Sequence, residues 1–247
     1  MVAYLLVSTL IERRRPPMEL APRRALGLVW GLLGGAVVFG VLYLLIMAFG
    51  GFRFEGAATV DWSAWWVRVL VTGAGIGIVE EIMLRGILYR IVEEFTGTWI
   101  ATALSGILFG LAHLTNPQAT RWGAVAIGLE AGVLFALLYA FTRSLWIVIG
   151  FHAGWNLAQG PILGGFVAGT NSPPSLFHTS VHGPDLITGG DFGPEASMIA
   201  LGFLLIVTAV LCRLLVKHRA VVAPMWIRRA RQRAELDPGA RQRTELT

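Results

Sequence analysis

The sequence predicts an all-α protein, a polytopic bundle of membrane-spanning helices, and its composition supports this fold class in three ways. Of the 247 residues, 55% are hydrophobic and only 14% are charged, and the mean hydropathy is +0.66. A soluble domain carries about 25% charged residues, and so few charges could not cover a water-facing surface at this length. An ordinary cytosolic enzyme, a disordered chain and a coiled coil are therefore excluded. A bundle whose apolar surface faces lipid remains.

The N-terminal half begins with three expected helical segments. Residues 1–11 are apolar, with no charged stretch before them and no cleavage site after them, which indicates a short membrane segment or interfacial helix and not a signal peptide. Residues 25–50 are 26 residues without a charge, long enough to span a bilayer with some tilt. Residues 62–95 favour one long helix that is apolar at first and strongly polar in its second half.

Four more apolar segments complete the expected bundle. They cover residues 99–114, 123–141, 145–159 and 196–212. Isolated charges fall between the segments, as expected for connections at a membrane surface. We therefore expect a single integral membrane domain over residues 1–247, with six spans and residues 1–11 as a candidate further one.

The basic residues predict the orientation of this bundle. The net charge is +5, but five arginines lie between Arg13 and Arg24, and nine basic residues lie between Arg213 and Arg243. Basic clusters beside apolar runs indicate cytoplasmic anchors against anionic lipid, so nucleic acid is not an expected partner. With residues 13–24 in the cytoplasm, five crossings place residues 171–195, which contain no Lys or Arg, outside, and the sixth returns the tail to the cytoplasm. The predicted localisation is the cell membrane, multi-pass, with a cytoplasmic C-terminal tail.

Two regions carry little regular pattern. The outer loop, residues 161–195, is rich in Gly, Pro, Ser and Thr and is expected to lack regular structure. Its His178 and His182 lack acidic neighbours at ligand spacing, which favours a solvated loop over a metal pair. The basic tail, residues 213–247, repeats a short piece after ten residues, which is typical of a solvated or lipid-surface tail.

Charged side chains inside the expected spans are the main functional signal. Glu80, Glu81 and Arg85 lie in an otherwise apolar helix, where each charge costs about 2.5–3.5 kcal/mol at bilayer depth. Glu81 and Arg85 are four residues apart with the acid first, the favourable order for an ion pair. Glu80 points about 100° away and suits a general base or acid; the alternative is a buried charge cluster that only fixes helix packing. Glu130 either pairs with Arg85 or lines the same interior.

Three further polar residues occur on neighbouring helices. His113 closes one apolar segment, and His152 and Asn156 are four residues apart on another, so the latter two share a helix face. Polar side chains on apolar helices require polar partners or water in the bundle interior. We therefore expect Glu80, His113, His152 and Asn156 to converge on one water-holding cavity.

This set of residues has a definite chemistry. Glu80 with His113 could deprotonate a water molecule that attacks a carbonyl, while His152 and Asn156 donate hydrogen bonds to the resulting oxyanion. No Ser or Cys nucleophile is needed, and the spacing shows no Ser–His–Asp arrangement. Cys212 is the single cysteine, which excludes a disulfide framework and a CxxC metal site.

The same residues form three motifs in order. Residues 80–85 read EExxxR, residues 109–113 read FxxxH and residues 152–156 read HxxxN. On successive membrane helices, these resemble the CPBP family (CAAX protease and bacteriocin-processing, or Abi, family), which includes the type II CAAX prenyl endopeptidases. The resemblance covers the family core, residues 62–159; the outer loop and the basic tail lie outside it.

The resemblance implies an intramembrane endopeptidase. It implies that Glu80 and His113 activate water, that His152 and Asn156 form the oxyanion site, and that Glu81 and Arg85 are supporting residues. The implied partners are a membrane peptide or protein substrate and the lipid bilayer. The family's substrate would be a C-terminal isoprenyl-cysteine peptide, but nothing in this sequence specifically recognises a prenyl group.

The candidate residues raise the question of whether the site binds a metal ion as a cofactor. Glu80, His113 and His152 could offer one oxygen and two imidazole ligands to Zn²⁺, as in a metalloprotease. The sequence has no HExxH pair, and glutamate–histidine activation explains the same residues without a metal. A glutamate-type peptidase without a cofactor is therefore favoured, with zinc as the alternative.

Two other functions compete with proteolysis. A non-catalytic membrane partner, such as a bacteriocin-immunity or scaffolding protein, would use the same polar residues for assembly. A small transporter would use the intramembrane acids to carry protons, but the two halves of the sequence show no inverted repeat, which counts against it.

Overall fold

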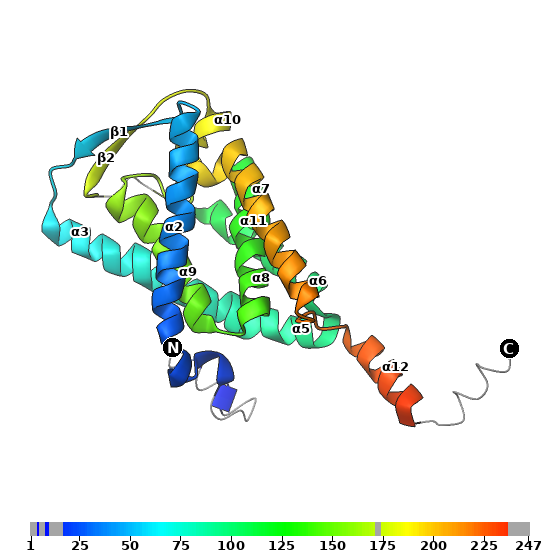
Figure 1. Ribbon diagram of the computed structural model, residues 1–247. Coiled ribbons are helices and arrows are strands. Elements are labelled where there is room, and N and C mark those ends of the chain that lie inside the picture. Colours follow the sequence, from blue (N-terminus) through cyan, green and yellow to red (C-terminus); the bar gives the residue numbers. More distant parts are fainter. Residues whose placement is uncertain (1–3, 5–7, 10–16, 171–173, 237–247) are drawn as a thin grey trace.

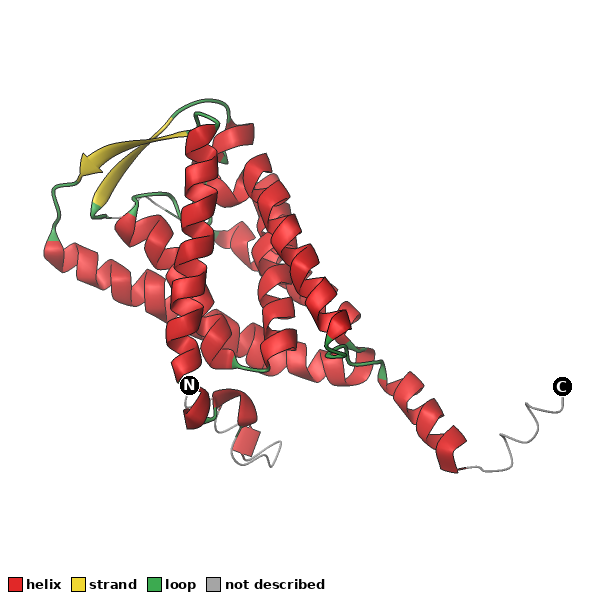
Figure 2. Ribbon diagram, viewed as in Figure 1, coloured by secondary structure: helices red, strands yellow, loops and turns green. Residues whose placement is uncertain are grey.

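The computed structural model describes residues 4, 8–9, 17–170 and 174–236. Helices make up most of this part of the chain, and the two strands lie together at one end (Figure 2). The expectation for residues 1–11 and the second copy of the tail repeat, residues 241–246, fall wholly or mostly outside the described residues.

The helices follow the expected apolar segments closely. The first half of the chain contains η2 Met18–Leu20, η3 Pro22–Arg24, α2 Leu26–Ala48, α3 Trp62–Arg68, η4 Val69–Ile76, α4 Gly77–Glu81, η5 Ile82–Tyr89, α5 Arg90–Thr96, α6 Thr98–Ala112 and η6 His113–Thr115. The second half contains α7 Arg121–Ile127, η7 Gly128–Gly132, α8 Val133–Thr142, α9 Leu145–Leu157, η8 Ala158–Ile162, α10 Asp185–Thr188, η9 Gly190–Phe192, η10 Pro194–Ala196, α11 Met198–Lys217 and α12 Met225–Leu236.

Within the described residues, four helices are long and apolar enough to cross a membrane. They are Pro22–Ala48, Thr98–Thr115, Arg121–Thr142 and Met198–Lys217. Each corresponds to one of the expected spans. The expected spans at 62–95 and 145–159 are helical as well, but they are not among these four, so the count of six spans remains a prediction.

The long helix, formed by α3 to α5 without a break, is the element that carries the first motif. It begins after Asp61, whose carboxylate accepts hydrogen bonds from the backbone N–H groups of Ser63 and Ala64. It ends at Gly97, where φ is 80° and a side chain would be strained. Its segments η4 and η5 are π-helical, a form that is frequent at functional sites. In Figure 1 this helix (cyan) runs at a steep angle to α2.

Glycines let α2 pack closely against α9. A Cβ atom at Gly31 would lie 2.2 Å from the Ile147 carbonyl oxygen, and one at Gly35 would lie 2.0 Å from the Phe151 carbonyl oxygen. On the other helix, a Cβ at Gly154 would lie 2.1 Å from the carbonyl oxygen of Leu32. Small residues at such interfaces allow two backbones to approach, which is how helices gain van der Waals contact in a membrane. This packing helps to bury α9, the helix that carries the HxxxN motif.

Adding one methyl group at this interface should therefore weaken the fold. We expect Gly35→Ala to lower the melting temperature of the purified protein, because the new Cβ collides with backbone that cannot move away, at a cost of about 1–3 kcal/mol. Gly40→Ala on the same helix is the matched control, since a Cβ there meets nothing within 4 Å. Equal melting temperatures for the two variants would contradict the assigned packing.

The outer loop has regular structure, so the expectation that it lacks any is wrong. Its strand β2, Phe177–Val181, pairs antiparallel with β1, Phe52–Ala57, and the short helices α10, η9 and η10 follow. A bulge lies between Phe54 and Gly56 in β1. The partner strand is more than a hundred residues earlier in the sequence, and a non-local pairing of this kind leaves no local signal in the Gly- and Pro-rich segment.

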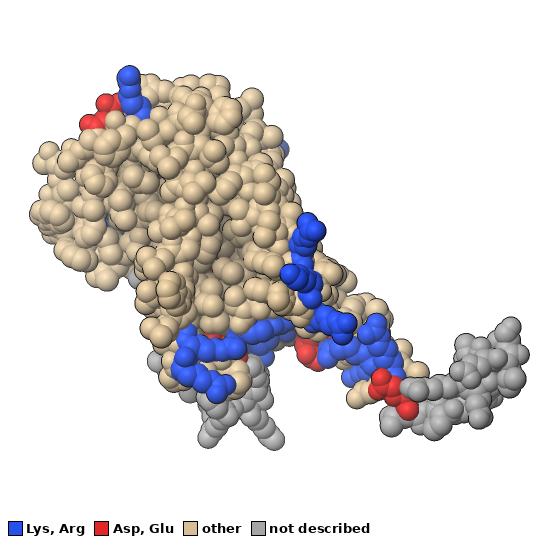
Figure 3. Space-filling model, viewed as in Figure 1, with Lys and Arg blue, Asp and Glu red and all other residues tan. Residues whose placement is uncertain are grey.

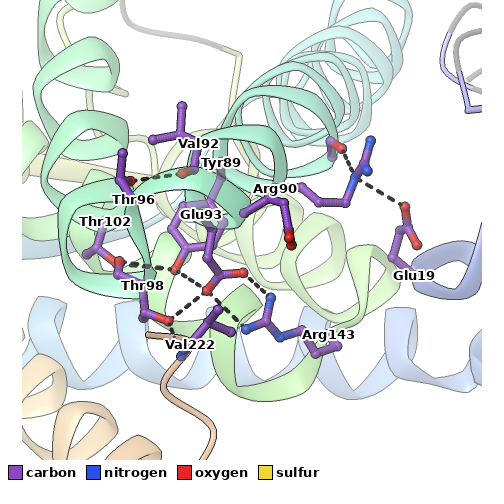
Figure 4. A network of polar contacts seen from close by, with 12 residues as sticks. Glu19, Tyr89, Arg90, Val92, Glu93, Thr96, Thr98, Thr102, Arg143 and Val222 are labelled. Atoms are coloured by element: carbon purple, nitrogen blue, oxygen red, sulfur yellow. Dashed lines mark hydrogen bonds and ion pairs between the residues drawn. The ribbon is translucent and has the colours of Figure 1, made fainter. Parts of the chain in front are cut away.

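A buried polar network joins the helices at the opposite end of the bundle (Figure 4). The carboxylate of Glu93 accepts hydrogen bonds from Thr98 Oγ1 at 2.8 Å and from Arg143 Nη2 at 3.0 Å. Thr98 Oγ1 also accepts the backbone N–H of Val222 at 2.8 Å. This network ties the end of the long helix to α6, to the turn after α8 and to the chain that follows α11.

The basic tail leaves the bundle at this same end. Helix α12 carries the first copy of the tail repeat and touches α5 through an ion pair between Arg228 and Glu94 at 2.8 Å. Lys and Arg side chains gather at this end of the molecule (Figure 3). The concentration of positive charge is the feature from which the sequence predicts the cytoplasmic side.

Candidate active site

The first motif places an ion pair in the interior of the bundle. Arg85 Nη1 lies 3.0 Å from Glu81 Oε1, and both side chains are fully buried. This confirms the intrahelical pair expected from the spacing. Arg85 Nη2 donates to the Gly132 carbonyl at 2.8 Å, and the guanidinium lies 5.1 Å from the centre of the Phe109 ring. Arg85 is thus committed to internal partners and is not directed at a ligand.

His152 lies between the two glutamates of the motif. Its Nδ1 is 2.9 Å from Glu81 Oε1, and its Nε2 is 3.9 Å from Glu80 Oε2. The Glu81 carboxylate is paired with Arg85 and acts as an acceptor, so His152 donates its Nδ1–H to Glu81. The geometry directs Nε2 toward Glu80. Glu81 therefore orients the second histidine of the site.

The FxxxH motif orients His113 in a different way. His113 Nδ1 lies 2.8 Å from the Phe109 carbonyl oxygen one turn earlier, and since a carbonyl only accepts, Nδ1 carries the proton. Nε2 is then the unprotonated nitrogen of the neutral ring. The Phe109 ring packs 4.6 Å from the His113 ring. Glu80 and His152 lie close enough to act electrostatically on His113.

Asn156 lies one turn after His152 on α9. Its Nδ2 donates to the Thr72 carbonyl oxygen at 3.3 Å, and the side chain is buried. The long helix approaches α9 closely here, since a Cβ at Gly77 would lie 3.5 Å from the His152 ring. One amide proton of Asn156 remains for another acceptor.

The structure brings Glu80, His113, His152 and Asn156 together around one cavity of about 90 Å³, which we call the site cavity. Its lining residues come from the long helix, the α6–η6 turn, α7 to α8, α9 and the outer loop. The cavity is large enough to hold ordered water. None of the described residues that line it is Lys or Arg.

Glu195 is a site-cavity residue that sequence reasoning missed. It belongs to η10 in the outer loop, is only 3% exposed and lines the cavity. The side chains of Gln159 and Trp155 and the backbone N–H of Ala168 donate hydrogen bonds to it. A single acid in a Gly- and Pro-rich loop gives no signal of burial, because its position depends on how the loop folds back over the bundle.

Neighbouring contacts hold Glu195 in place. Trp122 Nε1 donates to the Ala196 carbonyl oxygen at 2.7 Å. Ser197 caps α11, since its hydroxyl accepts the backbone N–H of Ala200 at 2.9 Å. The two residues that follow Glu195 are thus anchored to α7 and to the start of α11, and this fixes the direction from which Glu195 enters the cavity.

Burial should make the stability of the protein depend on pH through this residue. Burial raises the pKa of Glu195 to about 7, although hydrogen bonds from its own backbone N–H, Gln159 and Trp155 act in the opposite direction. Between the unfolded value of 4.5 and about 7, the folded chain retains a proton that the unfolded chain has released. The contribution is therefore present below pH 4.5 and is lost as the pH rises to 7, by roughly 3 kcal/mol in the free energy of unfolding.

Glu195→Gln tests this dependence. We expect the melting temperature of the wild type to fall between pH 5 and pH 8 by more than that of Glu195→Gln, with the two converging at low pH. Glu94→Gln, at an exposed position on the long helix, should follow the wild type. Parallel curves for the wild type and Glu195→Gln would contradict the assignment.

Glu130 neither pairs with Arg85 nor lines the site cavity, the two alternatives that the sequence offers for it. It is fully buried, and neither carboxylate oxygen has a hydrogen-bond partner in the described part of the chain. Arg85 donates hydrogen bonds to Glu81 and to the Gly132 carbonyl, and the residues that line the site cavity do not include Glu130. Its carboxyl group has an electrostatic neighbour in Glu195.

The arrangement of possible ligands bears on the metal alternative. Across the described residues, no group of three or more His, Cys, Asp or Glu side chains is placed to hold a metal ion. The candidate set from the sequence, Glu80, His113 and His152, is among these residues. His178 and His182 are among them as well, and His182 Nε2 lies 2.9 Å from Ser180 Oγ.

Comparison with known proteins gives an independent view of the same region. A curated relative from Bacillus subtilis (strain 168), named "Putative membrane peptidase YdiL", is 25% identical over 166 residues. The alignment covers 63% of this chain and 66% of the relative, just under two thirds of that protein's length. No solved structure matches this chain.

A family model locates the similarity within the chain. The model described as type II CAAX prenyl endopeptidase Rce1-like matches residues 62–158. This range contains all three motifs and nearly all of the family core expected from them, while Glu195 lies outside it. Over its central region, the chain therefore resembles the type II CAAX prenyl endopeptidases, as its motifs indicate.

Proposed function

We propose that this chain is a membrane-embedded endopeptidase that hydrolyses a peptide bond with a water molecule activated by Glu80 and His113. The observation that carries the proposal is the meeting of four motif residues from three separate helices at one buried cavity. The similarity to CAAX-type endopeptidases and to a protein named as a membrane peptidase supports a peptidase of this class.

Water activation is assigned to Glu80 and His113. Glu80 is the motif carboxylate that does not pair with Arg85, and one of its oxygens is buried without a hydrogen-bond partner among the described residues. His113 holds its Nδ1–H against a carbonyl, which leaves Nε2 to accept a hydrogen bond from water. A water between these two acceptors would lose a proton to one of them as its oxygen attacks the substrate carbonyl. The same group then returns the proton to the leaving amine.

Oxyanion binding is assigned to His152 and Asn156. Asn156 has one amide proton that the Thr72 carbonyl does not use, and it can donate to the developing negative charge. His152 donates Nδ1–H to Glu81, so its role requires a second proton on Nε2. Fixed donors of this kind cost no reorganisation during the reaction. Glu81 and Arg85 support the site by orienting His152 and balancing charge.

A comparison of membrane proteomes tests the function without a known substrate. Cells that make the wild type should contain new peptide termini in membrane proteins that are absent from cells with Glu80→Gln. Glu94→Gln, on the same helix but exposed, is the control and should give the wild-type pattern. Identical termini in all three samples, together with loss of a bound partner in Glu80→Gln, would replace this proposal with the non-catalytic membrane partner.

We propose a glutamate-type mechanism without a metal. It predicts that the purified protein keeps its cleavage activity in the presence of a strong chelator and holds no stoichiometric zinc. Metal content is measured on the same preparation as the activity. Stoichiometric zinc together with chelator-sensitive cleavage would overturn the glutamate-type assignment and favour Zn²⁺ held by Glu80, His113 and His152.

We also propose that the basic end of the molecule faces the cytoplasm. The polar residues of α12 and the network around Glu93 lie at that end, while the outer loop lies at the other (Figures 1 and 3). The site cavity is lined in part by residues of the outer loop. In this orientation, the substrate reaches the cavity from the side opposite to the tail.

A further inference from the structure

A groove lies between two of the candidate membrane spans, α6 and the helix that begins with α7 and η7. Its volume is about 560 Å³, within the range of about 300–1,000 Å³ that small-molecule sites occupy. Both helices are long and apolar enough to cross a membrane. The groove shares no lining residue with the site cavity, so it is a separate feature of the molecule.

Close contact between the two backbones forms the floor of the groove. A Cβ atom at Gly110 would lie 2.3 Å from the Ala124 carbonyl oxygen, and one at Gly128 would lie 2.8 Å from the Gly106 carbonyl oxygen. These positions line the groove and carry at most a methyl group. The space above the floor is therefore not filled by side chains of this chain.

Exposed apolar side chains form the walls. They are Ile107, Leu111 and Leu114 on one side and Val125 and Leu129 on the other, each 44–58% exposed. Along α6 and η6 the groove extends from Ala103 to Leu114, a length of about 16 Å at about 1.5 Å per residue. One leaflet is half of a hydrocarbon core about 30 Å thick. The groove thus has the length and the composition to hold one hydrocarbon chain.

Arg121 is the one charged residue among the described residues that line the groove. Its side chain is exposed and forms no hydrogen bond or ion pair with the described residues. It is the first residue of its span, beside Trp122, which is 42% exposed, and tryptophan is enriched where a membrane meets water. A chain in the groove would therefore place an anionic group at the membrane surface close to Arg121.

We propose that the groove binds an anionic phospholipid, with one acyl chain between α6 and α7 and the headgroup phosphate on Arg121. The inference goes beyond the proposed peptidase function and does not depend on it. The hydrogen bond from Trp122 to the Ala196 carbonyl places this end of the groove beside the outer loop, so the lipid belongs to the outer leaflet in the proposed orientation.

Charge complementarity favours a lipid over a second copy of the chain. The described residues that line the groove include no Asp or Glu. A second copy that packed its own groove here would bring another Arg121 and no acid to pair with it, and like charges at such an interface repel. An anionic headgroup supplies the missing partner.

The headgroup is tested by counting bound lipids with native mass spectrometry. The purified full chain is released from micelles that contain equal amounts of dioleoyl phosphatidylglycerol and dioleoyl phosphatidylcholine. We expect Arg121→Gln to retain one phosphatidylglycerol fewer than the wild type, with about fivefold weaker affinity for that lipid, the effect of one basic residue at an anionic lipid surface. Arg53→Gln, at an exposed position of β1 outside the groove, should match the wild type. Equal counts for the wild type and Arg121→Gln would overturn the proposal.

The acyl chain is tested at the other end of the groove. Ala103→Phe fills the space beside an exposed alanine and should lose the same lipid while Arg121 is unchanged. If this variant does not fold, the wild type alone still decides the point. Phosphatidylglycerol should raise its melting temperature, whereas sn-glycerol 3-phosphate, which has no chain, should not. Equal stabilisation by the two would assign Arg121 to a free phosphate and overturn the lipid site.

Two further outcomes would replace the proposed occupant. Retention of phosphatidylcholine and phosphatidylglycerol in equal amounts at the position that Ala103→Phe blocks would show that any chain enters, and would overturn the role of Arg121. A dimer of the wild type that Ala103→Phe dissociates would assign the groove to a second copy of the chain and overturn the lipid.

Discussion

Glu80→Gln is expected to lower kcat by about 10³-fold on a confirmed peptide substrate, with little change in KM. Glutamine has the shape of glutamate but cannot accept a proton from water, and a positioned general base contributes about 10²–10⁴-fold. The measurement is single-turnover cleavage by the purified protein, with melting temperature recorded to show that the variant is folded. Glu94→Gln should retain full activity, because its carboxylate lies at the exposed end of the same helix and pairs with Arg228.

His113→Ala should cause a loss of similar size. If Glu80 and His113 activate one water molecule together, the double variant will be only slightly slower than either single variant, because groups that act as a unit are not additive. Losses that multiply would mean that the two residues act in separate steps. A rate for Glu80→Gln within twofold of the wild type would remove Glu80 from the mechanism.

Arg85→Met is expected to cause the largest loss of stability, about 3–5 kcal/mol in the free energy of unfolding. Arg85 and Glu81 are both fully buried, so removal of the arginine leaves the Glu81 carboxylate as an uncompensated charge in the bundle interior. The carbonyl of Gly132 loses its donor as well. The measurement is denaturant unfolding in detergent, or the melting temperature where unfolding is not reversible.

The double variant Glu81→Gln with Arg85→Met separates charge from packing. It removes both charges, and replacement of a buried pair by uncharged residues is often close to neutral. We therefore expect it to recover most of the stability lost in Arg85→Met. The double variant should be inactive, since glutamine at position 81 no longer offers a carboxylate to His152 Nδ1. An Arg85→Met variant as stable as the wild type would show that the pair does not hold the interior together.

Local pattern was enough to predict the helices and one feature of the site. The uncharged residues 25–50 correspond to a helix in the structure that is long and apolar enough to cross a membrane. Length and composition of one segment are sufficient to predict such a helix. The ion pair of Glu81 and Arg85 followed from a spacing of four residues on one helix. His152 and Asn156 lie on one face of α9 for the same reason.

Other parts of the site depend on contacts between distant segments. The outer loop was expected to be irregular, and β2 forms because β1 lies beside it. Glu81 accepts a hydrogen bond from His152 Nδ1 on another helix and so determines which ring nitrogen carries the proton. Spacing within one helix cannot reveal this contact. The sequence allows Glu130 either to pair with Arg85 or to line the cavity, and among the described residues it does neither.

The sequence by itself determined that the chain is a helical membrane protein and which few polar residues lie on its apolar helices. These properties depend on the order of residues within one segment, since each charged residue raises the free energy of membrane insertion separately. The tertiary structure decided which of those residues share a cavity, how each histidine is oriented, and that Glu195 joins them from the outer loop. Such features depend on where segments far apart in the chain meet, and hydrogen bonds between them are made only once the bundle has packed.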